Sequence, residues 1–401
     1  MDYTFDNILI TGGSGFIGSN YINYLFKNYS NKIIINVDRL DYCSNINNVD
    51  KSLNINNSYF FYKTDISNFD YLYDIMNRHN IDTVIHFAAQ THVDNSFCNS
   101  VQFVIDNIVG TNYLLEVCRK YNKINKFIHF STDEVYGEVG LDDSGCTEKS
   151  LLNPTNPYAA SKAGAEFIVR SYYYSFKIPI VITRCNNAYG PNQYHDKLIP
   201  KFINHLLNNE KCTIHGNGTA LRTFIHTDDI SNAVDIILKK GIINEVYNIG
   251  SFNEYNVMDI FDLLVNKLKF IHYDNKNEWL TYVSDRNFND MRYYVSIDKL
   301  TNLGWSEKVN FIDGLNEVIS WYINNIFKEN LNDDLKKLNK SIIDDFKINL
   351  DFNSLKISEK ITININHNLS NNYNNLEYSE KLNEINNNLF LSWVYKTILS
   401  L

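Results

Sequence analysis

A glycine-rich turn near the N-terminus constrains this 401-residue chain more than any other feature. Residues 11–18 read TGGSGFIG and lie between a short apolar run, expected to be a strand, and an expected helix at 16–28. Gly12 permits a tight turn, Gly15 lets the backbone approach a pyrophosphate, and Gly18 permits close packing of the helix on the strand. The free N–H groups of the first helical turn then favour an anion. Packing alone also selects such glycines, so the turn needs a second signal.

Asp38 supplies that signal. It ends the expected strand at 32–37 and follows Gly18 by twenty residues. A carboxylate at this place accepts the ribose hydroxyls of a dinucleotide and repels a 2′-phosphate, so NAD is favoured over NADP. Arg39 weakens the preference, because an arginine can accept a phosphate. Asp65 and Ile66 follow another apolar run and are candidates for contact with adenine, although Asp65 is also suited to capping a loop.

Short apolar runs alternate with helical patterns through the first 190 residues. Strands are expected at 7–11, 32–37, 60–63, 83–87, 126–131 and 179–184, with helices at 16–28, 70–79, 101–121 and 159–176. This alternation predicts an α/β fold, a doubly wound parallel sheet of the Rossmann type. We expect a cofactor domain at 1–190 with a returning strand near 245–250, a smaller substrate lobe at 191–326, and an Asn-rich extension of unknown role at 327–401.

Composition narrows the classes of protein that the chain can be. The net charge of −9 excludes a chain-wide basic surface for nucleic acid, so no nucleic-acid partner is expected. No apolar stretch of about 18 residues exists, so no transmembrane helix is expected. The six cysteines form no C-x-x-C pair and the N-terminus lacks the pattern of a signal peptide. These features predict a cytoplasmic protein with free thiols and without a bound metal.

Tyr158 and Lys162 form the second constellation. They are four residues apart in an expected helix and therefore share one helical face. An ammonium beside a phenol stabilises phenolate, so we expect Lys162 to lower the pKa of Tyr158 and make it a base for a hydroxyl proton. With 28 tyrosines in the chain, this spacing carries meaning only because a glycine-rich cofactor turn precedes it.

The third constellation is the run Ser131, Thr132, Asp133 and Glu134, directly after the apolar run 127–130. Ligands of doubly wound sheets bind beyond the carboxyl ends of the strands, so these side chains should reach the reacting end of the cofactor. Neighbouring carboxylates in such a site can acquire different pKa values and serve as one acid and one base. The alternative is an ordinary helix-capping loop.

Together the three motifs resemble the extended short-chain dehydrogenase/reductase superfamily, and within it the nucleoside-diphosphate-glucose 4,6-dehydratases. Further matching stretches are HFAAQTHVDNSF at 86–97, STDEVYG at 131–137, NPTNPYAASK at 153–162 and NDMRY at 289–293. The resemblance covers roughly residues 5–325. The pair Asp133 and Glu134 is its most specific part, because sugar-nucleotide epimerases of the superfamily lack it.

The resemblance implies a bound NAD that is regenerated in each turnover and a catalytic set of five residues. Tyr158, assisted by Lys162 and Thr132, would take the proton of the glucose 4-hydroxyl as C4 loses hydride. Glu134 would remove the C5 proton, and Asp133 would protonate the 6-hydroxyl so that water leaves. The product would be an NDP-4-keto-6-deoxyglucose for deoxysugar synthesis of the rhamnose type.

The family's binding residues carry over by position. The NAD site would comprise Gly12, Gly15, Phe16, Ile17, Gly18, Asp38, Arg39, Leu40, Asp65, Ile66, Phe87, Ala88 and Ala89, together with Tyr158 and Lys162. The nucleotide-sugar substrate would contact Thr91, Thr132, Asn187, Lys197, Leu198, Arg222, Arg286 and Asn289. The two arginines would meet the diphosphate, where a planar guanidinium suits paired oxygens.

Departures from the bacterial dTDP-glucose pattern leave the nucleotide open between dTDP and UDP. Gln90 replaces a Glu, Asn289 a His, Ala188 an Asn and Val257 an Asn, as in the eukaryotic-type enzymes. The alternatives are a 4-epimerase or decarboxylase of the superfamily, or a catalytically silent binding scaffold. The resemblance also implies a homodimer formed through the helices at 101–121 and 159–176.

Overall fold

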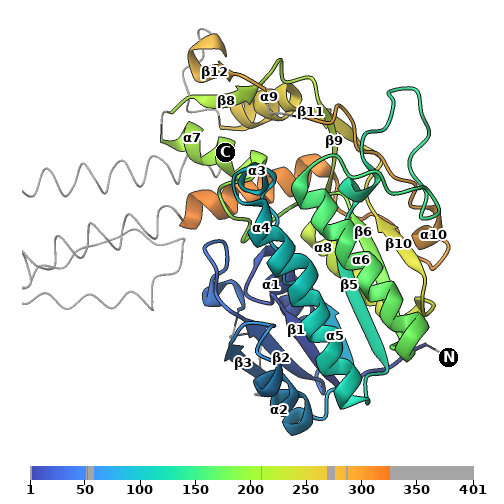
Figure 1. The fold of residues 1–401 in the computed structure, drawn as a ribbon. Helices are drawn as coiled ribbons and strands as arrows, with labels where there is room; N and C mark the ends of the chain where they lie inside the picture. The colour runs from blue at the N-terminus through green and yellow to red at the C-terminus, as the bar shows by residue number, and fades with distance from the viewer. Residues whose placement is uncertain are drawn as a thin grey trace, which may run out of the picture. The chain divides into compact units, whose positions relative to one another are not determined.

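The computed structural model describes residues 2–50, 52, 58–208, 210–268, 276–285 and 288–325. The predicted extension at 327–401 lies outside these residues. A parallel sheet of seven strands dominates the fold, in the spatial order β10-β6-β5-β4-β1-β2-β3 (Figure 1). Its strands are β1 (Asn7–Thr11), β2 (Ile33–Asp38), β3 (Tyr59–Lys63), β4 (Thr83–His86), β5 (Lys126–Thr132), β6 (Ile180–Cys185) and β10 (Val246–Ile249). The predicted α/β class and the returning strand are confirmed.

Alternate side chains of each strand enter different cores, because successive residues of a strand point to opposite faces. Ile8 and Ile10 pack with helices α1 (Phe16–Asn28) and α8 (Thr227–Lys240) on one face. Leu9 packs on the other face with α2 (Phe69–His79), α5 (Gly110–Tyr121) and α6 (Pro157–Phe176). Both faces of the sheet are therefore covered by helices, which is the doubly wound arrangement.

The helix predicted at 101–121 is not a regular α-helix. It consists of α4 (Ser100–Phe103), a π-helical segment η3 (Val104–Val109) and α5. A π-helix inserts an additional residue into the turn and shifts the side chains that follow, and such segments are frequent at functional sites. Here η3 directs Asp106 and Asn107 toward neighbouring loops, where their side chains form hydrogen bonds.

Smaller elements form a second core. A three-stranded sheet contains β7 (Asn187–Tyr189), β9 (Leu221–His226) and β11 (Glu254–Asn256), and a two-stranded sheet contains β8 (Cys212–His215) and β12 (Leu280–Val283). Helices α7 (Leu198–Leu207), α9 (Val257–Lys267) and a helix at 311–325 supply most of the apolar side chains between them. Among the described helices, none has the length and apolar character required to cross a membrane.

Register decides where the loops of the large sheet meet. Thr11 at the end of β1 pairs with Val37 of β2 and His86 of β4. Thr132 at the end of β5 pairs with Cys185, and Cys185 pairs with Ile249. All these strands are parallel, so the segments that follow them leave the sheet at the same edge.

Candidate functional site

A large cavity of about 940 Å³ is formed by residues that follow these strand ends and by the smaller sheets. That volume is near the upper end of the range usual for ligand sites, roughly 300–1,000 Å³. Its lining includes Gly12 after β1, Asp38 on β2, Ala88 after β4 and Thr132 on β5. The cavity is therefore large enough for more than one small molecule.

The glycine-rich turn lines one end of the cavity. Gly12 has a φ of +71°, and a Cβ there would lie 2.6 Å from the backbone nitrogen of Ala88. A Cβ at Gly18 would collide with the carbonyl oxygen of Gly12. Gly15 is the N-cap of α1 and offers no side chain to cap the helix. The backbone N–H groups of the first turn consequently remain suited to an anion, and the turn fits the pyrophosphate of a dinucleotide.

Asp38 ends β2 beside this turn and lines the cavity. Its carboxylate accepts hydrogen bonds from the backbone nitrogens of Ser14 at 3.0 Å and Leu40 at 2.8 Å. Burial raises the pKa of Asp38, although both backbone donors oppose that shift. Leu40 itself does not line the cavity, and its contribution is this backbone N–H. The predicted ribose-binding carboxylate is thus held rigidly at the cavity wall.

Arg39 is surrounded by carboxylates. Its guanidinium lies 2.6 Å from Asp41, 3.1 Å from Asp65 and 2.6 Å from Asp106. The amide of Gln90 also donates to Asp41 at 3.0 Å and to Asp106 at 2.9 Å. Three carboxylates around one guanidinium leave this part of the cavity negative. Arg39 is therefore engaged with its neighbours, and the wall as a whole repels a 2′-phosphate, which favours NAD.

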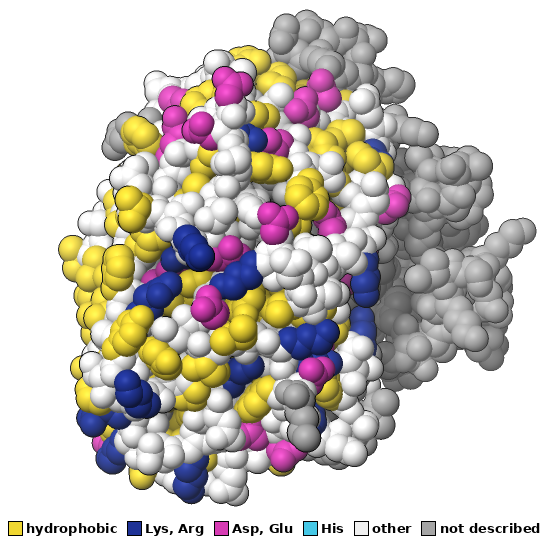
Figure 2. All heavy atoms as spheres, turned by 90° about the vertical axis from the view of Figure 1, so that its right-hand side faces the viewer, with side chains coloured by type: hydrophobic (Ala, Val, Ile, Leu, Met, Phe, Trp, Pro, Cys, Tyr) yellow, Lys and Arg dark blue, Asp and Glu magenta, His cyan; other side chains and the backbone are white. Residues whose placement is uncertain are grey.

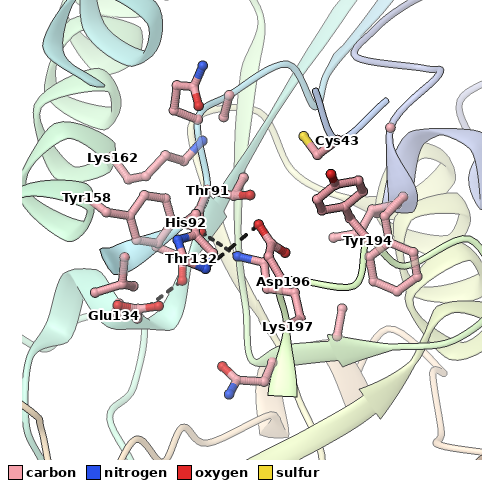
Figure 3. Close-up of a pocket in the computed structure, with 18 of the residues that line it drawn as sticks. Cys43, Thr91, His92, Thr132, Glu134, Tyr158, Lys162, Tyr194, Asp196 and Lys197 are labelled. Atoms are coloured by element: carbon pink, nitrogen blue, oxygen red, sulfur yellow. Dashed lines mark hydrogen bonds and ion pairs between the residues drawn. The ribbon is translucent and has the colours of Figure 1, made fainter. Parts of the chain in front are cut away.

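Tyr158 and Lys162 lie on one face of α6 and both line the cavity (Figure 3). The ammonium of Lys162 donates to the carbonyl oxygen of Phe130 at 2.7 Å, and burial lowers its pKa to about 8. Burial and the charge of Glu134 raise the pKa of Tyr158 above its ordinary value. The predicted lowering of the Tyr158 pKa is thus not found in the protein alone, because burial and the charges of Glu134 and Asp133 raise it more than the hydrogen bond with Thr132 lowers it.

Thr132, Asp133 and Glu134 leave the end of β5 in three different environments. The Thr132 hydroxyl donates to Oδ1 of Asp133 at 3.2 Å and accepts from the backbone nitrogen of Glu134 at 3.4 Å. Thr132 and Glu134 line the cavity, whereas Asp133 lies behind Thr132 and is only 2% exposed. Figure 3 shows Thr132 and Glu134 beside Tyr158.

The two carboxyl groups are held by two asparagines. Asn156 donates to Glu134 at 3.0 Å, and the same amide caps α6 by accepting from the backbone nitrogen of Ala159 at 2.8 Å. Asn186 donates to Asp133 at 2.5 Å. Burial raises the pKa of both carboxyl groups, and burial together with the charge of Glu134 raises that of Asp133 to about 7. A pair of this kind can hold one acid and one base near neutral pH.

Predicted substrate residues line the rest of the cavity. Arg222 on β9 donates to the backbone carbonyls of Leu221 and Asp290, and its guanidinium lies over the ring of Tyr293. Lys197 donates to the carbonyl oxygen of Thr91 at 2.8 Å. The other predicted substrate residues that line it are Thr132, Asn187, Leu198 and Asn289. Arg286 lies outside the described residues, so its predicted contact is untested.

The cavity also brings together residues that were not predicted. Asn156, Asn186, Asp106 and Gln102 all line it. The Asn–Pro pair at 156–157 predicts the start of a helix, but nothing in the sequence indicates that the Asn156 amide also reaches Glu134. Asp106 lies within the π-helical segment, whose shifted spacing is not recognisable from the apolar pattern.

Comparison with known proteins identifies relatives across most of the chain. The family model described as GDP-mannose 4,6 dehydratase matches residues 9–318. A dTDP-D-glucose 4,6-dehydratase of Dictyostelium discoideum is 46% identical over 81% of this chain and 83% of its own. A trifunctional UDP-glucose 4,6-dehydratase of Arabidopsis thaliana is 45% identical over 80% of this chain and 47% of its own.

A solved structure shares the fold. The dTDP-glucose 4,6-dehydratase of Streptomyces venezuelae, crystallised with NAD and TYD bound, is 33% identical with a TM-score of 0.75. The match covers 80% of this chain and 97% of that chain.

Replacing Gly15 with alanine tests the cofactor end of the cavity. A Cβ at Gly15 meets only the carbonyl oxygen of Gly12 at 3.2 Å, so Gly15→Ala should change the unfolding temperature little. The methyl group would nevertheless stand between the turn and a pyrophosphate, so NAD affinity should fall about ten-fold or more. Calorimetric titration with NAD measures this, and unchanged affinity in a folded variant would contradict the assignment.

Proposed function

Because the chain belongs to the nucleoside-diphosphate-glucose 4,6-dehydratases of the extended short-chain dehydrogenase/reductase superfamily, we propose that its cavity holds NAD⁺ beside one glucose nucleotide. The enzyme converts dTDP-glucose or UDP-glucose into the NDP-4-keto-6-deoxyglucose and water. The observation that carries the assignment of roles is the grouping of Tyr158, Thr132 and Glu134 on one cavity wall, with Asp133 directly behind Thr132.

The product belongs to deoxysugar nucleotide synthesis of the rhamnose type. The Arabidopsis relative joins the dehydratase to an epimerase and a reductase that lead to a rhamnose nucleotide. This chain spans about half the length of that relative. The epimerase and reductase reactions are therefore not assigned to it. We propose that residues 1–190 with β10 hold the cofactor, that the smaller sheets hold the nucleotide, and that residues 327–401 do no chemistry.

The reaction begins at the 4-hydroxyl of glucose. NAD⁺, held by the glycine turn and Asp38, would supply the acceptor for the C4 hydride and its return to C6. Tyr158 removes the proton of the 4-hydroxyl, which must leave as C4 becomes a carbonyl. Tyr158 must be a phenolate to accept this proton. Burial raises its pKa and opposes that form, and the ammonium of Lys162, one turn away on the same helix face, is the charge that would stabilise it. Thr132 supplies a hydroxyl beside Tyr158 that orients the substrate oxygen.

Elimination of water requires a base and an acid on the same hexose. The new 4-carbonyl acidifies the C5 proton, which Glu134 removes. Asp133 donates a proton to the 6-hydroxyl, the C6–O bond breaks, and the C5 electron pair forms the C5–C6 double bond. Asp133 does not itself line the cavity. Its proton therefore passes to the substrate by way of the Thr132 hydroxyl, which contacts Asp133 and lines the cavity. Glu134 finally returns a proton to C5.

The helical face formed by Val101, Val104, Phe167 and Tyr174 supports a homodimer. These side chains are 68%, 46%, 61% and 62% exposed, and they belong to α4, η3 and α6, which pack together. Figure 2 shows hydrophobic side chains gathered along the left edge of that view. A contiguous apolar surface of this kind is usual at an interface. A second copy of the chain would bury it. All six cysteines are free thiols, which supports a reducing, cytoplasmic location.

Asp133→Asn tests the acid role. The amide cannot donate a proton to the 6-hydroxyl, so product formation should slow by about 10²–10⁴-fold while oxidation at C4 continues. Acid-quenched reactions analysed by mass spectrometry should contain the 4-ketoglucose nucleotide. Glu134→Gln is the matched comparison, because it should additionally abolish exchange of the C5 proton with deuterated water. Elimination at the normal rate in Asp133→Asn would refute the role.

Phe167→Glu tests the proposed homodimer. A carboxylate on this face cannot be buried against a second copy without a large desolvation cost, so the variant should sediment as a monomer where the parent chain is a dimer. Tyr282→Glu is the control, because Tyr282 is 55% exposed on β12 and outside this face. The proposal fails if the Phe167 variant sediments like the parent chain.

A further inference from the structure

Asn186 makes the closest side-chain contact to Asp133. Its amide nitrogen donates to Oδ2 of Asp133 at 2.5 Å, while the Thr132 hydroxyl contacts the other carboxyl oxygen at 3.2 Å. Asn186 is 4% exposed and lines the cavity, so the contact is shielded from bulk water. Each oxygen of the carboxyl group thus has one partner, and only Oδ1 faces the hydroxyl that borders the cavity.

The register of three neighbouring strands creates this contact. Thr132 pairs with Cys185 and Cys185 pairs with Ile249, so the next residues, Asp133, Asn186 and Gly250, leave the sheet at the same level. The backbone nitrogen of Asn186 also donates to the carbonyl oxygen of Ile249 at 2.9 Å, which fixes the start of this segment.

Gly250 provides the space that the amide occupies. A Cβ at Gly250 would overlap the side-chain oxygen of Asn186. That oxygen is buried and has no hydrogen-bond partner. The amide therefore lies between Asp133 on one side and a glycine on the other, and its hydrogen bond is made to Asp133.

The charge around Asp133 shows why a donor is needed there. Glu134 faces it with a negative charge, Arg222 contributes a positive one, and the ionisable groups Tyr158, Cys146 and Cys185 lie near enough to interact with it. Once Asp133 gives up its proton, a second buried anion exists beside Glu134. A hydrogen bond to a charged group contributes about 1.5–3 kcal/mol, which makes the Asn186 amide the main uncharged support for that anion.

We propose that Asn186 is a positioning residue for the elimination step, which holds Asp133 and stabilises the carboxylate left by its proton transfer. This inference rests on the proposed acid role of Asp133. As the C6–O bond breaks, the proton moves from Asp133 to the leaving oxygen, and the amide N–H then donates to the resulting carboxylate. An amide presents a donor and an acceptor, so a half-turn of its side chain lets its oxygen accept from the protonated acid.

Asn186→Leu tests the proposal, because leucine has a similar size and no donor. Without the N–H the carboxylate is destabilised, so the pKa of Asp133 rises and the high-pH limb of kcat moves to higher pH by about one to two units. In the parent chain that limb should lie near pH 7, where Asp133 titrates. The maximum of kcat should fall about ten- to a hundred-fold, with KM unchanged and the 4-ketoglucose nucleotide accumulating.

Thr183→Val is the matched control. Thr183 lies on β6, the strand that Asn186 directly follows, is fully buried and has a hydroxyl without a partner, so this variant should keep the parent pH profile. Asn186→Asp provides a second test should the leucine variant not fold. It places a second carboxyl group at the distance of the present hydrogen bond. The pair then titrates in two steps, and loss of the last shared proton, which sets the limb, is moved to higher pH by the like charges.

The outcomes distinguish the role of Asn186 from the acid role of Asp133. Loss of kcat at every pH without movement of the limb, or an unchanged profile, overturns the role of Asn186. Normal elimination by Asp133→Asn overturns the acid role itself, whatever Asn186 does. An upward shift in both Asn186 variants, with Thr183→Val unchanged, supports the proposal.

Discussion

The parallel register of β1, β2, β4, β5, β6 and β10 is the constraint on which the site depends. Since these strands point in one direction, the glycine turn, the Asp38 carboxylate, the carboxyl groups of Asp133 and Glu134 and the Asn186 amide all emerge at one edge. Apart from the adjacent Asp133 and Glu134, these groups come from segments that are distant in sequence. Asp38 and Asp133 are separated by a long stretch of chain. Asp38 is nevertheless the last residue of β2, and Asp133 directly follows the last residue of β5.

The net charge of −9 raises the question of how an acidic chain binds a dinucleotide and a sugar nucleotide, both of them anions. The structure answers it locally. Backbone N–H groups at the start of α1 are suited to one anion, and the cations of Arg222 and Lys197 line the same cavity and are suited to the other. The carboxylates around Arg39 are at the cofactor side, where they select against an additional phosphate. Positive and negative side chains thus line different parts of the cavity, and the net charge of the chain does not reveal this arrangement.

Sequence analysis predicted the sheet well, because short apolar runs and glycine turns are local signals. The strand over Asn7–Thr11 and the helix over Phe16–Asn28 have the bounds that were expected. Features of the structure that depend on contacts between residues distant in sequence could not be predicted in this way. The π-helical segment interrupts a predicted regular helix, and burial together with the charge of Glu134 raises the pKa of Tyr158, which was expected to be lowered. The contact of Asn186 with Asp133 could not be predicted either, because it is created by the register of neighbouring strands.

The central claim is that one cavity performs oxidation at C4 and reduction at C6 on a single hexose. An equal mixture of glucose nucleotide carrying deuterium at C4 and glucose nucleotide carrying carbon-13 in its ring measures this directly. We expect product in which deuterium appears at C6 only in molecules without carbon-13, because the hydrogen never leaves the cavity that removed it. Deuterium lost to water, or found at C6 of the carbon-13 product, would contradict the claim.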